Sequence, residues 1–246
     1  MKPKKIGGWL QGLYLQSATA KEIIGTVRED TWGNKYAYSK AGAVDLVASQ
    51  ICISTADDAD WTSQACTAQA VGDRNITQTI AAYASAIAEN YFQGGQFILT
   101  DGTAEGIRYT IIYSSAVTSS GTEINLTLDD PLVEALTSAT EFTLVKSPQY
   151  GTVVQATPAN RPAGIPLIDV TKAYYYWSQI GGEALCLGGT QEGAVGSVVS
   201  GAVADDGAME ELNIDGNAIP WTAPVYGMVT GTAVVDGEYT PVKLTR

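Results

Sequence analysis

The feature that most constrains this chain is a series of short segments in which apolar and polar residues alternate. A period of two places one face of a segment in a core and the other in water, as in a β-strand. Turn-forming pairs such as Gly94-Gly95 and Asp101-Gly102 separate the segments. We therefore expect an all-β fold made of small antiparallel sandwich or barrel modules. The clearest segments are Gln96–Thr100, Ile107–Tyr113, Glu123–Leu128 and Glu141–Val145.

Helices are expected to be few, and the second half of the chain shows the same alternating pattern as the first. Gln78–Phe92 is rich in alanine and has apolar residues at spacings of three and four, which predicts a helix over its second half. Pro131–Leu136 predicts a single helical turn. We expect at most one or two short helices. Further strands are expected at Leu167–Val170, Ala173–Gln179, Ala184–Leu187, Gly196–Val199, Met209–Ile214, Val225–Gly231 and Glu238–Leu244.

Composition along the chain indicates two β modules behind an N-terminal arm. Three prolines and a glycine fall within residues 157–166, which favours an extended connector. We therefore expect a basic N-terminal arm at 1–40, a first β module at 41–156 and a second β module at 167–246.

Charge is distributed unevenly between the arm and the remainder. The net charge is −12, while residues 1–40 carry seven cations and three anions. Such an acidic chain repels phosphate backbones and anionic lipid, so we expect neither nucleic acid nor membrane as a partner. No apolar run reaches the length of a membrane span and the N-terminus lacks a secretory signal pattern, so a soluble protein is expected. The basic arm can be either a docking segment for an acidic surface or a solvated terminus.

The chain offers little for catalysis. It has no histidine, which removes the usual general base, the Ser-His and Cys-His nucleophile pairs and the commonest zinc ligand. Cys52, Cys66 and Cys186 are far apart in small or apolar runs and predict buried thiols in a reducing compartment. No catalytic residue, metal site, cofactor or small-molecule substrate is therefore expected. Glycoside hydrolysis remains open, because two suitably placed carboxylates suffice and the sequence does not place its 26 acidic residues in space.

The most distinctive segment is the aromatic run Tyr174-Tyr175-Tyr176-Trp177. In a strand, Tyr174 and Tyr176 point to one face, and Tyr175 and Trp177 to the other. A strand that is aromatic on both faces is either covered on both sides within its own chain or presents one face to another chain. The sequence leaves both alternatives open.

Several strings resemble structural proteins of tailed bacteriophages. Asp30–Ala43 is similar to their opening "dxwGrxyrYxkaga", Asn90–Tyr109 to a glycine-rich strand pair and Leu126–Leu132 to an "LxLxdPl" element. Tyr174–Gly182 is similar to their "yYfWlQtwGp" strand and Gly237–Leu244 to their closing strand. The strings occur in the family's order from residue 30 to residue 244. The chain departs from the pattern at Gly181-Gly182, where the family has Trp-Gly-Pro.

The resemblance implies a head-fibre-like capsid cement or decoration protein, made in the bacterial cytoplasm and located on the outer surface of the virion. It implies the major capsid protein as partner and, by analogy with capsid symmetry, a homotrimer. It supplies no catalytic residues. The alternatives are a tail or head fibre adhesin that binds host glycan and, from another class, a carboxylate-pair glycoside hydrolase. The expected interface residues are Lys4, Lys5, Trp9, Tyr14, Trp32, Tyr174, Tyr176 and Trp177.

Overall fold

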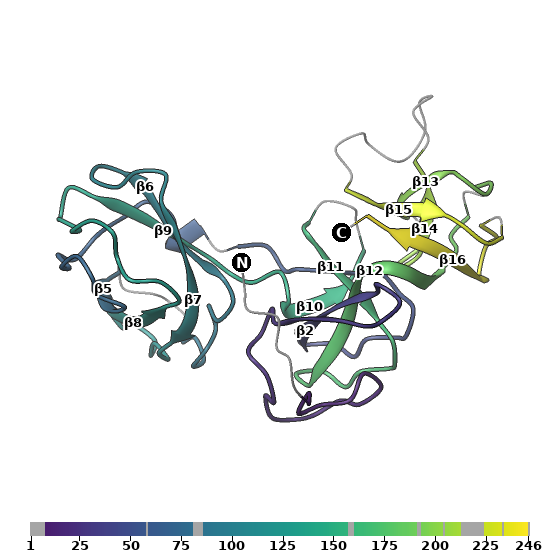
Figure 1. Ribbon diagram of the computed structural model, residues 1–246, viewed down its shortest axis with the longest axis horizontal. Helices are drawn as coiled ribbons and strands as arrows, with labels where there is room; N and C mark the ends of the chain where they lie inside the picture. The colour runs from purple at the N-terminus through teal and green to yellow at the C-terminus, as the bar shows by residue number, and fades with distance from the viewer. Residues whose placement is uncertain are drawn as a thin grey trace. The chain divides into compact units, whose positions relative to one another are not determined.

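The structure is a computed structural model that describes residues 8–57, 59–80, 86–156, 160–190, 193–203, 205–212, 224–232 and 234–245 (Figure 1). Its regular elements are β-strands, and within these ranges the helical element is the three-residue 3-10 helix Ala59–Trp61. The expected all-β fold with sandwich or barrel modules is confirmed. The chain forms two compact units: unit 1 is Met1–Thr55 with Gly151–Arg246, and unit 2 is Ala56–Tyr150.

Unit 1 contains a closed ring of five strands. Each strand pairs with the next and the last pairs with the first, which satisfies backbone groups that an open edge would leave unpaired. The short strand β1 (Val27–Glu29) extends this ring as an antiparallel hairpin with β2. The ring order is β2 (Lys35–Ala41), β10 (Tyr150–Val154), β3 (Cys52–Ile53), β11 (Pro162–Pro166) and β12 (Tyr175–Leu187).

The long strand β12 continues into a second set of strands in unit 1, and Figure 1 shows it passing between the two. The later residues of β12 pair with β16. At the other end of this second set, Met209 of β14 forms a bridge with Gly188, the residue that follows β12. Ile51 and Ile165 join the core of this second set. The two sets therefore share a strand and part of a core. The order after β12 is β16 (Tyr239–Leu244), β15 (Val225–Val229), β13 (Val198–Gly201) and β14 (Met209–Glu211).

Three of the four aromatic residues, Tyr175 to Trp177, begin β12, and both faces of the strand are covered here inside unit 1. Tyr176 packs with Ala41 and Cys52 in one buried cluster. Trp177, which pairs with Tyr38 across the strands, packs with β2 aromatics in another. Of the two alternatives that the sequence left open, the structure has the one in which this chain covers its own aromatic strand.

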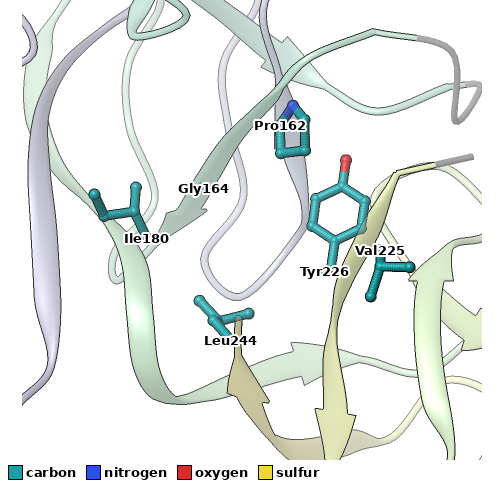
Figure 2. A pocket seen from close by; sticks show the side chains of 6 residues that line it. All are labelled: Pro162, Gly164, Ile180, Val225, Tyr226 and Leu244. Atoms are coloured by element: carbon teal, nitrogen blue, oxygen red, sulfur yellow. The ribbon is translucent and has the colours of Figure 1, made fainter. Parts of the chain in front are cut away.

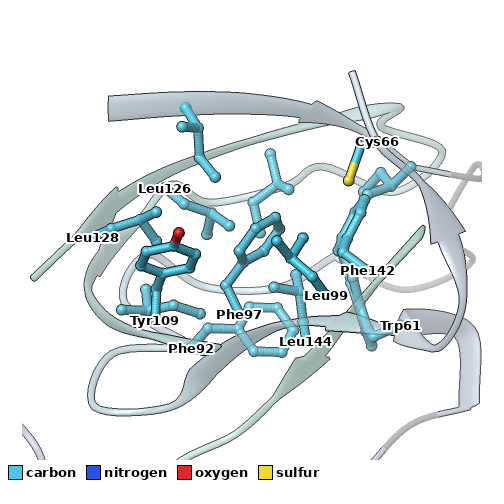
Figure 3. Packing of buried hydrophobic residues seen from close by; sticks show 14 of the residues in the cluster. Trp61, Cys66, Phe92, Phe97, Leu99, Tyr109, Leu126, Leu128, Phe142 and Leu144 are labelled. Atoms are coloured by element: carbon cyan, nitrogen blue, oxygen red, sulfur yellow. The ribbon is translucent and has the colours of Figure 1, made fainter. Parts of the chain in front are cut away.

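Unit 2 is a six-stranded antiparallel sheet around its own core (Figure 3). Eighteen of the described residues are buried in this core, and the ring centroids of Phe97 and Phe142 lie 5.2 Å apart. The segment after β4 is tied to the other outer strand, because the backbone N of Thr67 donates to Gln78 Oε1 at 2.8 Å. The order is β4 (Gln64–Ala65), β9 (Glu141–Val145), β6 (Gln96–Asp101), β7 (Arg108–Ser114), β8 (Glu123–Leu128) and β5 (Asn75–Thr79).

The expected helix in Gln78–Phe92 is wrong. Its first two residues belong to β5, and residues 86–92 form turns and a bridge from Ile87 to Val117; residues 81–85 lie outside the described ranges. The expected helical turn at Pro131–Leu136 is also absent, since that segment forms bends that end in a bridge to Gln69. In both places apolar side chains, among them Ile87, Phe92, Leu132 and Leu136, enter the core of unit 2 from irregular backbone.

The module boundaries of the structure differ from those expected. The expected arm, 1–40, contributes β1 and β2 to unit 1. The expected first module, 41–156, is divided, because β3 and most of β10 belong to unit 1 whereas 56–150 form unit 2. The expected connector, 157–166, contains β11. The reason is long-range pairing, such as β3 with β11 and β2 with β12, which local composition does not reveal.

Candidate docking surface

The β1–β2 hairpin carries the most exposed aromatic side chain of the described residues. Trp32 is 89% exposed at the turn between the two strands. Asp30 Oδ1 accepts hydrogen bonds from the backbone N of Trp32 at 2.8 Å and of Asn34 at 2.9 Å, and Oδ2 accepts from Asn34 Nδ2 at 2.9 Å and the Tyr36 hydroxyl at 3.1 Å. Burial would raise the pKa of Asp30, but these hydrogen bonds outweigh it and lower the pKa below its ordinary value. A charged carboxylate therefore holds the turn.

The same turn is attached to the bend of β12. Asn34 Oδ1 accepts a hydrogen bond from the backbone N of Glu183 at 3.0 Å. Gly182, beside it, has a φ of 82°, and a Cβ at this position would collide with Asn34. Only glycine fits this backbone conformation and this spacing without strain. The turn thus presents Trp32 on ordered backbone, which reduces the entropy lost when a partner binds.

Residues 8–26, here called the covering segment, pack on the β2 and β12 face that carries Tyr38 and Trp177. Gln11 is central to this packing, with a side chain that is 4% exposed. Its Oε1 accepts from the Tyr38 hydroxyl at 2.7 Å, and its Nε2 donates to the carbonyl oxygens of Leu15 at 2.7 Å and Tyr175 at 3.0 Å. Trp177 Nε1 donates to the Gln11 carbonyl at 3.0 Å. The covering segment is therefore part of the fold of unit 1.

The covering segment and the hairpin expose an unusual share of large apolar side chains. Six of the nineteen that are exposed among the described residues come from residues 10–32. Scattered exposed apolar residues are ordinary, so the concentration of six in one stretch of the chain makes this stretch the candidate binding surface. We call these six the apolar surface: Leu10, Tyr14, Leu15, Ile23, Val27 and Trp32.

The residues expected at an interface separate into three groups. Tyr14 and Trp32 are exposed and belong to the apolar surface. Trp9 and Tyr174 are half-buried, with Trp9 packed edge-on against Trp177 at 5.2 Å. Tyr176 and Trp177 are in the core, where no partner reaches them. Lys4 and Lys5 lie outside the described residues.

Sequence reasoning did not single out Leu10, Leu15, Ile23 or Val27 as surface residues. Leu10, Leu15 and Ile23 lie in the covering segment, which has no period that would distinguish an exposed apolar residue from a buried one. Val27 begins β1, a strand of three residues that is too short to show an alternation. A signal for the turn was present, since Asp30 with Gly33 and Asn34 is typical of a side-chain-capped reversal.

The cysteines are buried free thiols, as expected. Burial raises the pKa of Cys52 and of Cys186 to about 12 and that of Cys66 to about 11. Since the thiolate is the reactive form, these groups stay protonated and unreactive at neutral pH.

One small cavity lies in unit 1, lined mainly by apolar side chains (Figure 2). Its volume of about 30 Å³ gives room for a water molecule. Small-molecule sites occupy roughly 300–1,000 Å³, so this cavity does not admit a substrate. The lining residues are Pro162, Gly164, Ile180, Val225, Tyr226 and Leu244.

Across the described ranges, no group of three or more His, Cys, Asp or Glu side chains is arranged to hold a metal ion. Within those ranges there is also no helix with the length and apolar character needed to span a membrane. Comparison with known proteins found no family model, no curated protein and no solved structure that matches the chain.

Proposed function

We propose that this chain is a structural protein of a tailed-bacteriophage virion, a cement or decoration protein that binds the outer surface of the major capsid protein shell and stabilises it. The observation that carries the proposal is the apolar surface, with Trp32 held on a clamped hairpin. Tryptophan is one of the side chains enriched among the residues that supply most of the binding energy of an interface. The string Asp30–Ala43, on which the phage resemblance begins, covers this same turn and strand.

The many identical binding sites that a capsid shell offers support such a role. A lattice offers many identical sites, so a modest contact made by each copy gives strong net attachment when copies are linked. A homotrimer placed at threefold positions of the lattice is the assembly that we propose, because closed symmetry is usual for repeated subunits. The partner is protein, and no nucleic acid, membrane or small molecule is required.

Cosedimentation with emptied shells that lack this chain tests the proposal. Trp32→Ala should weaken binding about 30-fold, since truncating a tryptophan at the centre of an interface costs about 2 kcal/mol. Tyr239→Ala is the matched control, because Tyr239 is also an exposed aromatic residue of unit 1 but lies outside the apolar surface. Full-length protein should also raise the melting temperature of the shells. Failure of the full-length chain to sediment with shells would refute the proposed function.

A substitution is preferable to deletion of the N-terminus. Removing the covering segment would expose Tyr38 and Trp177, which it now covers, and would disturb unit 1 along with the surface. Loss of binding by such a truncation would not distinguish contact from misfolding.

The same protein preparation separates the alternatives. A fibre adhesin should bind host cells through glycan and should not bind emptied shells. A carboxylate-pair glycoside hydrolase should release reducing sugar from polysaccharide, with activity lost when one carboxylate is replaced by its amide.

A further inference from the structure

Unit 2 occupies the position of a hairpin loop in unit 1. Strands β3 and β10 pair antiparallel, with Ile53 opposite Val153. Thr55 and Gly151, the residues of unit 1 next to the boundary, remain close, since a Cβ on Gly151 would lie 3.8 Å from Thr55 Oγ1. The two ends of this pair are therefore near enough to be joined by a two-residue turn, and the chain instead inserts 95 residues, Ala56–Tyr150, between them.

Unit 2 has an apolar core that is independent of unit 1. All eighteen residues of its core cluster lie between Trp61 and Leu144. The other three buried clusters draw only on unit 1. Burial of apolar area is the main favourable term in folding, so each unit has its own source of stability.

Lys146 ties together the segments that enter and leave unit 2. Its side chain is 6% exposed, and Nζ donates to the Ala56 carbonyl at 2.8 Å. Its backbone N donates to Asp57 Oδ1 at 3.2 Å, and Nζ lies 5.4 Å from the centre of the Tyr91 ring. These partners all belong to unit 2. These contacts hold the two ends of unit 2 together.

Most of the net charge also belongs to unit 2. Residues 56–150 contain 12 acidic and 3 basic side chains, a net charge of −9 out of −12, which leaves −3 for unit 1. The apolar surface, by contrast, lies wholly in unit 1. Charge and apolar surface are therefore divided between the two units.

We infer that unit 2 is a guest domain, removable at the β3–β10 hairpin without unfolding unit 1, and that unit 1 alone carries attachment to the shell. The second half of this inference rests on the proposed function. Insertion at a hairpin tip leaves the strand pairing of the host intact, and such tips tolerate inserted domains.

The first test uses the full chain with fluorine-labelled tryptophan followed by NMR during heating. Trp61 is the only tryptophan in residues 56–150 and reports on unit 2, while the buried Trp177 reports on unit 1. Leu126→Ala in the core of unit 2 should lower the midpoint at Trp61 by about 10 °C and leave Trp177 unchanged. The matched change Ile165→Ala in unit 1 should lower the midpoint at Trp177 by about 5 °C and leave that at Trp61 unchanged. If either variant moved both probes equally, unit 2 would not be an independent domain.

The second test replaces residues 56–150 by Asn-Gly, so that Thr55 and Gly151 are joined by the turn preferred in two-residue hairpins. The excised chain should show a cooperative transition at Trp177 and should cosediment with emptied shells within threefold of the full chain. Shells decorated with it should migrate more slowly toward the anode, because each copy has lost nine negative charges.

The outcomes separate the two proposals. An excised chain that does not fold overturns removability. An excised chain that folds but does not sediment with shells, when the full chain does, overturns the assignment of attachment to unit 1. If the full chain itself does not sediment with shells, the proposed function fails, while the folding result still decides whether unit 2 is a guest domain.

Discussion

Replacing Gln11 by alanine tests whether one buried side chain holds the covering segment on unit 1. The change removes three side-chain hydrogen bonds, to Tyr38, Leu15 and Tyr175. At roughly 0.5–1.5 kcal/mol each, their loss costs about 2–4 kcal/mol. Opening of the segment should therefore become about 30- to 1,000-fold more frequent.

Hydrogen exchange of the full chain measures this opening. The amide of Ser17, which donates to the Tyr175 carbonyl at 3.0 Å, should lose protection by that factor in Gln11→Ala. Gln16→Ala is the control, since Gln16 is an exposed glutamine of the same segment with a hydrogen bond to the Thr171 amide. Equal exchange at Ser17 in the two variants would refute the role given to Gln11.

Three further predictions concern the hairpin and the charge of unit 2. Gly182→Ala places a side chain at a left-handed φ and against Asn34, so thermal unfolding of unit 1 should lose about 2 kcal/mol while unit 2 is unchanged. Because the pKa of Asp30 is lowered in the folded protein, its stabilisation of the hairpin is complete above pH 3.8, its ordinary pKa, and is lost as pH falls through the folded pKa. Amide exchange at Trp32 should therefore rise only at this acid pH, and Asp30→Asn should abolish this pH dependence. Raising salt from about 0.02 to 0.5 M should stabilise residues 56–150 more than unit 1, since screening relieves repulsion among their acidic side chains; an equal shift in both units would contradict this.

Local alternation predicted individual strands well. Glu123–Leu128 and Glu141–Val145 are strands with the bounds expected from the sequence. In both, alternate residues are apolar and buried: Ile124, Leu126 and Leu128 in the first strand, and Phe142 and Leu144 in the second. Such segments are specified by their own residues, so no knowledge of their partners was needed.

Pairing between distant residues was not predictable in the same way. Pro162–Pro166 looks like a connector because of its prolines, yet it pairs with Cys52 and Ile53 through an irregular register. The insertion between β3 and β10 was hidden for a related reason, because a reading along the chain assigns neighbours in sequence to the same module. Burial of Trp177 depended on the covering segment, whose Gln11 lies 166 positions earlier in the chain.

Strand β12 has neighbours on both sides of its bend at Gly181–Gly182, with β2 and β11 before the bend and β16 after it. Because β12 belongs to both the closed ring and the second set of strands, it cannot separate from one set without disturbing its pairing in the other. Disruption of either half of unit 1 is therefore expected to reach the other half through β12. Insertions and deletions are therefore expected to be tolerated best at hairpin tips that lie away from β12.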